Sequence, residues 1–333
     1  MRKDPIKQAL QAVQDLRSQG ASDDTVTALV EVVHKHPSIV VVQAAKLAAE
    51  WQVEALVPAL ETAFYRLSEN GQEEDPQCWG KVALVKALHA LAWQGADVYV
   101  QGCKAVQLEP VYGGKEDSAA PVRSASFRAL VQLPAVATAT IMTTLADLLV
   151  DESANVRAEA ARSSIYCPAE LTQPLLRLKI RTGDADSRVV GTCFDALLVV
   201  APTEETVDLV LEYTHSKDAL QAEALAALAS SAVPEAVAAV TKSYPTLADA
   251  QVQRVVFTSL GASPTEQAFD FLCHLLGFAP LPEATWALDA LKSQLYGDRA
   301  EAVADRVQVR RDSELLCRFQ RFLAEARGGL EQC

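Results

Sequence analysis

The chain has 333 residues, of which 50% are hydrophobic and 22% are charged, so it holds enough apolar material for a large packed core and too little charge for intrinsic disorder. Only 6% of the residues are aromatic, and 14 glycines and 15 prolines supply few turns, which argues against a β-sandwich or barrel and favours helices. The formal net charge of −13 argues against nucleic-acid partners and against docking on an anionic membrane.

The sequence also indicates the cellular compartment of the protein. Charged residues run through the apolar pattern of the N-terminal segment, so we expect no export signal. The longest uncharged stretch, residues 129–146, contains Pro134 and several threonines, and it predicts a helix end followed by a helix start rather than a membrane span. The seven cysteines include no Cys-x-x-Cys pair. We therefore expect reduced thiols in a cytoplasmic protein, with no disulfide and no zinc site.

Residues 1–36 predict N-terminal capping helices. Apolar side chains recur at helical spacing from Ile6 to Leu16 and again from Val26 to Val33. Caps of this kind cover the apolar face that the first member of a repeat array would otherwise expose. We place the repeat array directly after them, in residues 37–297.

An acidic residue followed by a helical apolar pattern marks each repeat. This pattern begins at Asp117, Asp151 and Asp184, at intervals of 34 and 33 residues, and it continues more weakly from Val40 to Glu283. Each copy predicts one helix, which we term helix B of its repeat. The best-marked helices B are expected at residues 118–132, 153–166, 187–200, 218–230 and 248–260.

Prolines mark a second helix in each repeat. Pro134, Pro168, Pro202, Pro234 and Pro264 keep nearly the same interval, and each opens a predicted helix A. Proline is favoured at the first helical position because its missing N–H would have no partner there. Each repeat is therefore a helix pair, and a pair this short must stack on neighbours to bury its apolar faces.

These residues resemble a known repeat family. The acidic residue, the Val-Arg pair and the spaced apolar positions at Asp117 and Asp151, together with the proline-led helix A, are similar to HEAT repeats in the short form also found in phycobilin lyases. The resemblance covers residues 20–297. It implies an all-α solenoid, a right-handed superhelix of about seven to eight antiparallel helix pairs with N- and C-terminal capping helices.

Residues 298–333 predict the C-terminal capping segment of this single continuous domain. Leu315, Phe319 and Phe322 lie on one face of the expected helix, and Arg318 and Arg321 lie on the other. The segment holds as many basic as acidic residues. The negative net charge therefore belongs to residues 1–297.

Two inserts lengthen the early repeats and form our first candidate site. Equivalent positions of successive helices B are 40 residues apart from Val40 to Gly80 and 42 apart from Gly80 to Val122, which is longer than the usual interval. The extra residues fall at 68–79 and 109–117, between helix A and helix B of consecutive repeats. Equivalent turns lie on one rim, so we expect the inserts to be neighbours; the alternative is two solvated loops that only make turns. The residues expected to meet a partner are Glu73, Glu74, Asp75, Trp79, Tyr112, Lys115 and Glu116.

A row of cations forms the second candidate site. One position of four successive helices B, opposite the core-facing positions, is basic. The resemblance places this face in the concave groove, where the row could bind an acidic peptide or another anionic ligand. Alternatively, each cation pairs with acids such as Glu50 and Glu159. The row consists of Lys46, Lys86, Arg128 and Arg162.

Residues for catalysis are sparse, and we expect no catalytic residue, metal or cofactor. None of the five histidines precedes a glutamate, so the His-Glu dipeptides of HEAT-like di-iron hydroxylases are missing, and His34 and His36 fit a solvated helix end. Carboxylates near Cys78 are expected to raise its pKa, which disfavours a nucleophile. Arg123 and Arg157 are expected to brace aspartates of adjoining turns.

Two classes of function remain. The leading one is a non-enzymatic scaffold or adaptor that binds another protein in the concave groove, at the rim of the early repeats, or at both. The alternative is a lyase-like enzyme or chaperone that holds a small anionic ligand, such as a linear tetrapyrrole, for attachment to a partner protein.

Overall fold

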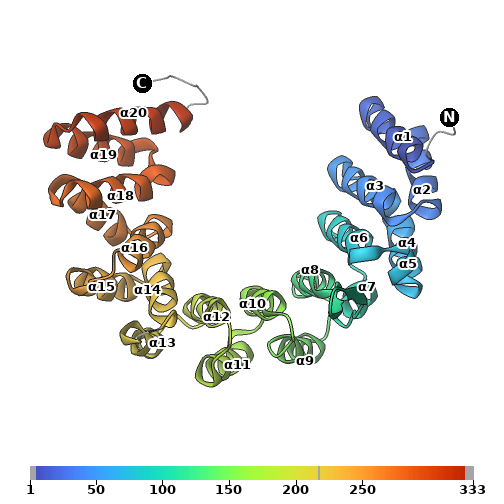
Figure 1. Cartoon of the computed structure of the whole chain (residues 1–333), viewed down its shortest axis with the longest axis horizontal. Coiled ribbons are helices and arrows are strands. Elements are labelled where there is room, and N and C mark those ends of the chain that lie inside the picture. Colours follow the sequence, from blue (N-terminus) through green and yellow to red (C-terminus); the bar gives the residue numbers. More distant parts are fainter. Residues whose placement is uncertain (1–4, 217, 327–333) are drawn as a thin grey trace. The chain divides into compact units, whose positions relative to one another are not determined.

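The fold is an all-α solenoid of stacked helix pairs, as the sequence predicts (Figure 1). A computed structural model describes residues 5–216 and 218–326, which form twenty α-helices and one two-stranded hairpin. Contacts divide the chain into two compact units, Met1–Leu171 and Thr172–Cys333. Within the described residues, no helix is both long and apolar enough to cross a bilayer.

The first unit has two layers of helices. In each layer, successive helices pack on one another, apart from α9, which packs on α8 and α10. Layer A consists of α2 (Asp23–Lys35), α4 (Val57–Glu69), α7 (Asp97–Cys103) and α9 (Thr138–Leu148). Layer B consists of α1 (Pro5–Gln19), α3 (Ser38–Trp51), α6 (Trp79–Ala90), α8 (Ala120–Leu130) and α10 (Ala154–Ser163).

The second unit repeats this arrangement. Helix α11 (Ala169–Thr182) crosses the boundary between the units, and the later helices alternate between the two layers. Its own layer A consists of α13 (Glu204–Leu211), α15 (Pro234–Ser243), α17 (Glu266–Phe278) and α19 (Gly297–Arg310). Layer B contains α12 (Ser187–Val200), α14 (Leu220–Ser230), α16 (Ala250–Ala262), α18 (Leu281–Leu291) and α20 (Ser313–Ala326).

Helix α2 illustrates how the sequence starts a helix and buries one face of it. The Ser22 side chain accepts a hydrogen bond from the Thr25 backbone N–H, and Thr25 Oγ1 accepts one from the Ser22 N–H. This capping box satisfies donors that the first turn leaves free. Leu29 and Val33, one turn apart, are completely buried. Burial of each such side chain stabilises the folded state by about 1.5–3 kcal/mol.

The predicted bounds of the helices B are confirmed to within three residues. Helix α12 occupies the predicted range 187–200, and α8, α10, α14 and α16 start one or two residues later than predicted. The starts of helix A differ more. Pro234 does occupy the first turn of α15, but Thr203 and Thr265 cap α13 and α17. A threonine oxygen that accepts from the first turn moves these starts beyond the proline.

The two ends of the chain pair like the helices between them. Helix α2 packs on α3, and α19 packs on α20, so residues 298–326 form two helices. Helix α20 buries Leu315, Phe319 and Phe322, the face that the sequence predicts. The division into caps at 1–36 and 298–333 around one continuous repeat domain stays a prediction.

Arg123 joins successive turns of the first unit, as predicted. Its Nη1 donates to Asp117 Oδ2 at 2.6 Å and to the Ala105 carbonyl at 2.8 Å, and its Nε donates to Asp151 Oδ2 at 2.7 Å. The Arg123 side chain is 7% exposed. Arg157 donates to the carbonyls of Asp151 and Glu152. Both arginines thus stabilise the turns before helices B.

We expect Arg123→Ala to lower the free energy of unfolding by about 3–5 kcal/mol, because it leaves two largely buried carboxylates without their cation. Urea denaturation measures the change. The control is Arg188→Ala, which removes a 67% exposed side chain paired with Asp186 and should cost less than about 1 kcal/mol. Equal losses in the two variants would contradict the role given to Arg123.

Candidate functional site

The two inserts of the early repeats meet, as predicted. The first forms α5 (Gly71–Glu74) and the 3-10 turn η2 (Pro76–Cys78), and the second forms strands β1 (Leu108–Val111) and β2 (Gly114–Asp117). Gln72 Nε2 in the first insert donates to the Leu108 carbonyl in the second at 2.7 Å. We term residues 68–79 and 106–118 together the rim platform.

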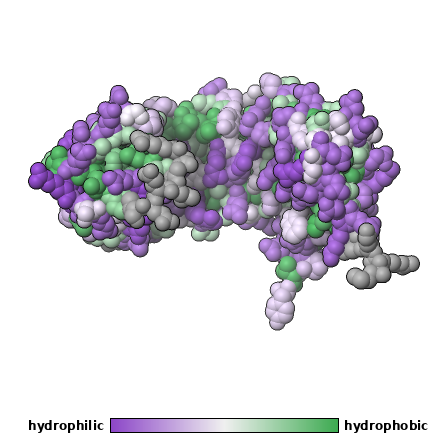
Figure 2. Space-filling model, turned by 90° about the horizontal axis from the view of Figure 1, so that it is seen from above, coloured by the Kyte–Doolittle hydropathy of each residue, from purple (hydrophilic) through white to green (hydrophobic). Residues whose placement is uncertain are grey.

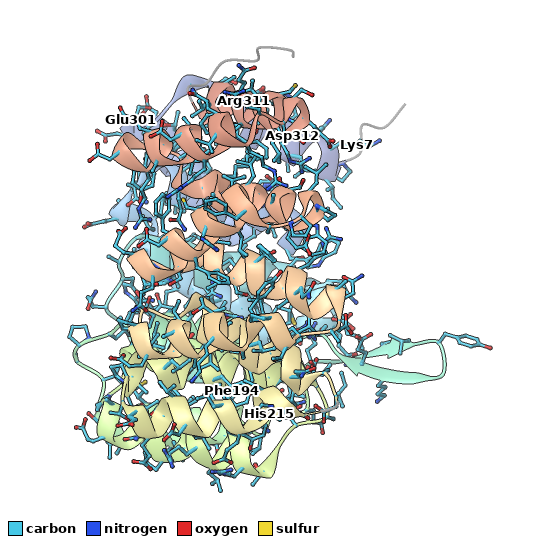
Figure 3. The ribbon with its side chains drawn as sticks, turned by 90° about the vertical axis from the view of Figure 1, so that its left-hand side faces the viewer. Lys7, Phe194, His215, Glu301, Arg311 and Asp312 are labelled. Atoms are coloured by element: carbon cyan, nitrogen blue, oxygen red, sulfur yellow. The ribbon has the colours of Figure 1, made fainter. Side chains whose placement is uncertain are left out.

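The second insert is a β-hairpin, which sequence analysis missed. Its strands pair from Leu108 with Asp117 to Val111 with Gly114, which leaves Tyr112 and Gly113 as the turn. Gly113 has φ 92°, a conformation that glycine adopts without steric cost. The only signal was the Gly-Gly pair after Val111 and Tyr112, since Pro110 and the charged residues 115–117 have low strand propensity. The hairpin extends away from the helices, and its tip projects from the molecular surface (Figures 2 and 3).

Asp75 holds the first insert against helix α6. Its side chain is completely buried, Oδ1 accepts from the Gly80 N–H at 2.7 Å, and Oδ2 accepts from the Lys81 N–H at 2.9 Å. The carboxylate thus lies at the positive end of the α6 dipole. The expectation that Asp75 faces a partner is wrong, because both of its oxygens serve the helix N-terminus.

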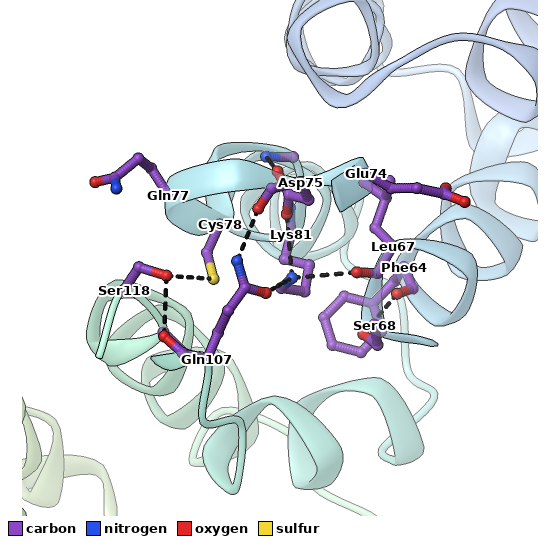
Figure 4. Close-up of polar contacts among 12 residues, drawn as sticks. Phe64, Leu67, Ser68, Glu74, Asp75, Gln77, Cys78, Lys81, Gln107 and Ser118 are labelled. Atoms are coloured by element: carbon purple, nitrogen blue, oxygen red, sulfur yellow. Dashed lines mark hydrogen bonds and ion pairs between the residues drawn. The ribbon is translucent and has the colours of Figure 1, made fainter. Parts of the chain in front are cut away.

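Lys81 and Gln107 extend this network to the second insert (Figure 4). Lys81 Nζ lies 3.3 Å from Asp75 Oδ2 and donates to the Leu67 carbonyl at 3.2 Å and to Gln107 Oε1 at 2.7 Å. Gln107 Nε2 donates in turn to the Asp75 carbonyl at 2.9 Å. The buried ammonium therefore has three acceptors, which offsets the cost of its burial.

Glu109 anchors the hairpin. This residue is only 8% exposed. Its carboxylate accepts hydrogen bonds from the Gln77 N–H at 2.7 Å, Gln77 Nε2 at 2.8 Å, Gln107 Nε2 at 2.6 Å and Ser118 Oγ at 2.7 Å. Burial raises the pKa of Glu109, but the hydrogen bonds from Ser118, Gln107 and Gln77 outweigh it, so the pKa lies below its usual value. Glu109 is therefore charged and fully hydrogen-bonded at neutral pH.

The backbone beside Glu109 is strained. Gln77 and Cys78 have φ values of 61° and 55°, two consecutive non-glycine residues in the left-handed region. Such a conformation costs on the order of 1 kcal/mol per residue and persists only where its surroundings determine it. Here the Gln77 N–H is fixed by Glu109. Strain of this kind is concentrated at functional sites.

The platform presents apolar side chains to water. Trp79 is 60% exposed, Tyr112 at the hairpin tip is fully exposed, and Val111 and Leu108 beside it are 43% and 45% exposed. Of the predicted charged contacts, Glu73, Lys115 and Glu116 are exposed, whereas Glu74 is half-exposed and pairs with Arg66 at 2.7 Å. Of the predicted rim residues, Glu73, Trp79, Tyr112, Lys115 and Glu116 are thus exposed on the two inserts, whereas Asp75 is buried.

The basic row lies where the sequence placed it, on four consecutive helices of layer B in the first unit, and all four side chains are exposed. Arg128 and Arg162, however, both bind Glu159, at 2.8 Å and 2.9 Å. Burial raises the pKa of Glu159, and hydrogen bonds from Arg128 and Ser163 lower it further than burial raises it. These two arginines are therefore not free cations, because they neutralise a buried carboxylate.

Lys46 and Lys86 differ from the two arginines. Neither has a carboxylate oxygen within 4.0 Å among the residues that the structure describes, and Glu50 pairs with Arg17 instead. A ligand-binding role for the row stays a prediction, and in this structure it depends on these two lysines.

The structure offers little for covalent or metal chemistry. Burial raises the pKa of the Cys78 thiol, the direction that the sequence predicts, although nearby carboxylates are only a minor cause. His34 and His36 lie at the end of α2, as expected. Within residues 5–216 and 218–326, no group of three or more His, Cys, Asp or Glu side chains could hold a metal ion.

No protein-family model matches this sequence, and no curated protein matches it. Among solved structures, the chain is similar to one from the complex of CpcE and CpcF of phycocyanin lyase from Nostoc sp. PCC7120. The two are 16% identical with a TM-score of 0.38, over 80% of this chain and 94% of that chain. A likeness at this level assigns neither a family nor an activity. The function proposed below therefore depends on the residues of this chain.

We expect Glu109→Gln to loosen the hairpin. Three of the four groups that contact the carboxylate are N–H donors, so the NH₂ of a glutamine side chain faces at least one of them, and the charge that strengthens these hydrogen bonds is removed, at about 1.5–3 kcal/mol. Amide hydrogen exchange in residues 107–118 should become about 10- to 100-fold faster. Glu116→Gln, on the opposite strand and exposed, is the control and should leave these rates unchanged.

The difference between wild type and Glu109→Gln should depend on pH. Because folding lowers the pKa of Glu109, its stabilising effect is fully present above the usual value of 4.5 and is lost as the pH falls below it. The ratio of exchange rates between the two proteins, measured at the same pH so that intrinsic rates cancel, should decline toward one below pH 4.5. A ratio that stays constant would show that Glu109 is not the group responsible.

Proposed function

We propose that this protein is a non-enzymatic scaffold that binds another protein through the rim platform, with Tyr112 as the central contact. The observation that carries the proposal is a fully exposed tyrosine at the tip of a hairpin whose base is fixed by a buried polar network. Free cysteines in the described residues fit a reducing compartment such as the cytoplasm.

The energetics of the platform favour a binding role over a pair of solvated loops. A loop that only makes a turn needs no buried carboxylate, whereas the platform buries Asp75 and Glu109, together with Lys81 of α6, and holds Gln77 and Cys78 in left-handed backbone. A buried charge costs free energy unless it is fully paired, and left-handed backbone costs free energy at any residue other than glycine. Their common effect is a rigid hairpin, which lowers the entropy lost when its tip is bound.

The chemistry of the platform indicates the chemistry of its partner. Tyrosine and tryptophan are enriched among the residues that contribute most to protein interfaces, where each fills a pocket in the partner. Tyr112 and Trp79 are the exposed aromatic side chains of the platform, and Glu73 and Glu116 are exposed on the same two inserts. A complementary surface would have an apolar pocket for Tyr112 with basic residues around it.

The alternative function, a small anionic ligand held by the basic row, has less support. It depends chiefly on Lys46 and Lys86, because Arg128 and Arg162 are both bound to Glu159. Two exposed lysines on flexible side chains are common on solvated helices and hold no ligand by themselves. The scaffold proposal has the greater number of independent observations.

Photo-crosslinking tests the proposal. With p-benzoylphenylalanine in place of Tyr112, a defined partner should be crosslinked in native extract. The same reagent in place of Phe278, which is 65% exposed on α17, should not crosslink that partner. Equal yields of the same proteins from both positions would refute a specific contact at Tyr112.

With that partner purified, Tyr112→Ala should weaken binding at least 30-fold, because a central interface tyrosine contributes about 2 kcal/mol or more. Isothermal titration calorimetry measures the affinity. Circular dichroism and the melting temperature should stay unchanged, since Tyr112 is fully exposed in the free protein. Phe278→Ala is the matched control, and its affinity should equal that of wild type.

A further inference from the structure

The second unit contains a cavity that the rim platform does not involve. It has a volume of about 800 Å³ and lies between the layer B helices α16, α18 and α20, each packed on the next. Cavities of 300–1,000 Å³ are of the size that holds small organic ligands. Its aromatic lining consists of Phe257, Trp286, Tyr296 and Phe322.

The position of Trp286 is fixed before any ligand arrives. Phe257 meets it edge-on with ring centroids 5.8 Å apart, and Tyr244 meets Phe257 from another direction at 5.6 Å. Between the aromatic groups the lining is small. A Cβ atom on Gly261 would lie 2.3 Å from the Ala290 carbonyl oxygen, so α16 and α18 are too close there for any side chain. Trp286 is thus packed against Phe257 on one side of the cavity, and Gly261 contributes no side chain to it.

Charged groups at the cavity leave one cation without an acidic partner. Lys292 pairs with Glu325 at 2.7 Å, and Arg318 and Asp289 form a two-point ion pair. The Arg254 guanidinium lies 5.8 Å from the Trp286 ring centre, and among the described residues no carboxylate oxygen lies within 4.0 Å of it. A guanidinium placed on a ring keeps its N–H groups available for a planar anion.

We propose that this cavity binds a small organic anion with a flat aromatic or conjugated body. The body would lie against Trp286, Tyr296 and Phe322, and its carboxylate or sulfonate would accept hydrogen bonds from Arg254. Apolar walls with a single directing charge are the usual composition of such sites. This site is independent of the proposed scaffold function, which can fail without affecting it.

The probe is 8-anilinonaphthalene-1-sulfonate, an aromatic sulfonate of suitable size. We expect saturable binding at one site per chain, weakened by added salt as for an ion pair partly open to water. Trp286 is the only tryptophan of residues 172–333. Energy transfer from tryptophan to the bound probe should therefore fall sharply in Trp286→Phe, which keeps an aromatic wall.

Two variants separate charge from shape. Arg254→Gln should weaken binding of the sulfonate two- to fivefold but leave N-phenyl-1-naphthylamine, the same fluorophore without the sulfonate, unaffected. Thr258→Trp fills the cavity from an exposed position on α16 and should abolish binding of both probes. Arg306→Gln removes an exposed arginine outside the cavity and is the control for net charge.

The three variants distinguish a specific site from scattered probe binding. Loss of both probes in Thr258→Trp, with the charge-selective effect of Arg254→Gln, supports the site. Several weak sites that Thr258→Trp leaves unchanged would overturn the proposal, since the probe would then be reporting scattered apolar surface. Equal effects of Arg254→Gln and Arg306→Gln would overturn the role of Arg254, because only net charge would matter.

Discussion

The structure depends on the fact that a pair of short helices cannot bury its apolar residues alone. Each pair here has helices of about two to four turns, and its apolar side chains are covered only when another pair packs on each side. Spacing along the stack is therefore fixed by helix packing, and a repeat cannot grow in the direction of the stack. Extra residues can enter only in the turns that join the helices, and one such turn leads from helix A to helix B. Both long inserts of this chain are found at that point.

The same constraint explains why the rim platform is held by polar groups. A hairpin that leaves the stack has no apolar core to pack on, and an isolated two-stranded hairpin is marginally stable in water. Its stability must come from hydrogen bonds at its base, where Glu109 receives four donors and Gln107 connects it to Lys81. Buried charge is tolerated there because each ion is fully paired. This leaves the tip free of any structural role.

Much of the fold could be predicted because it follows from periodicity. The interval of 33 or 34 residues located the helices B, and the breaks in that interval located the inserts. The hairpin could not be predicted in the same way, because its strands are four residues long and part of their support comes from Gln77, which is 32 residues from Glu109 in the sequence. Asp75 was placed on the surface for a related reason. A carboxylate in an acidic loop has the same sequence signature whether it is solvated or caps a helix.

The basic row shows what helical spacing alone cannot predict. Helical spacing correctly placed four cations on one exposed face, but it does not say which of them has an acidic partner. Glu159 is 6% exposed and lies three residues before Arg162 on α10. It contacts both that arginine and Arg128 of α8, the preceding helix of layer B. A buried carboxylate needs such partners, and its two arginines are bound to it before any ligand arrives. A free cation must therefore be identified from contacts, which is why Arg254 beside an aromatic wall is a better candidate for an anion site than Arg128 and Arg162, which already share a carboxylate.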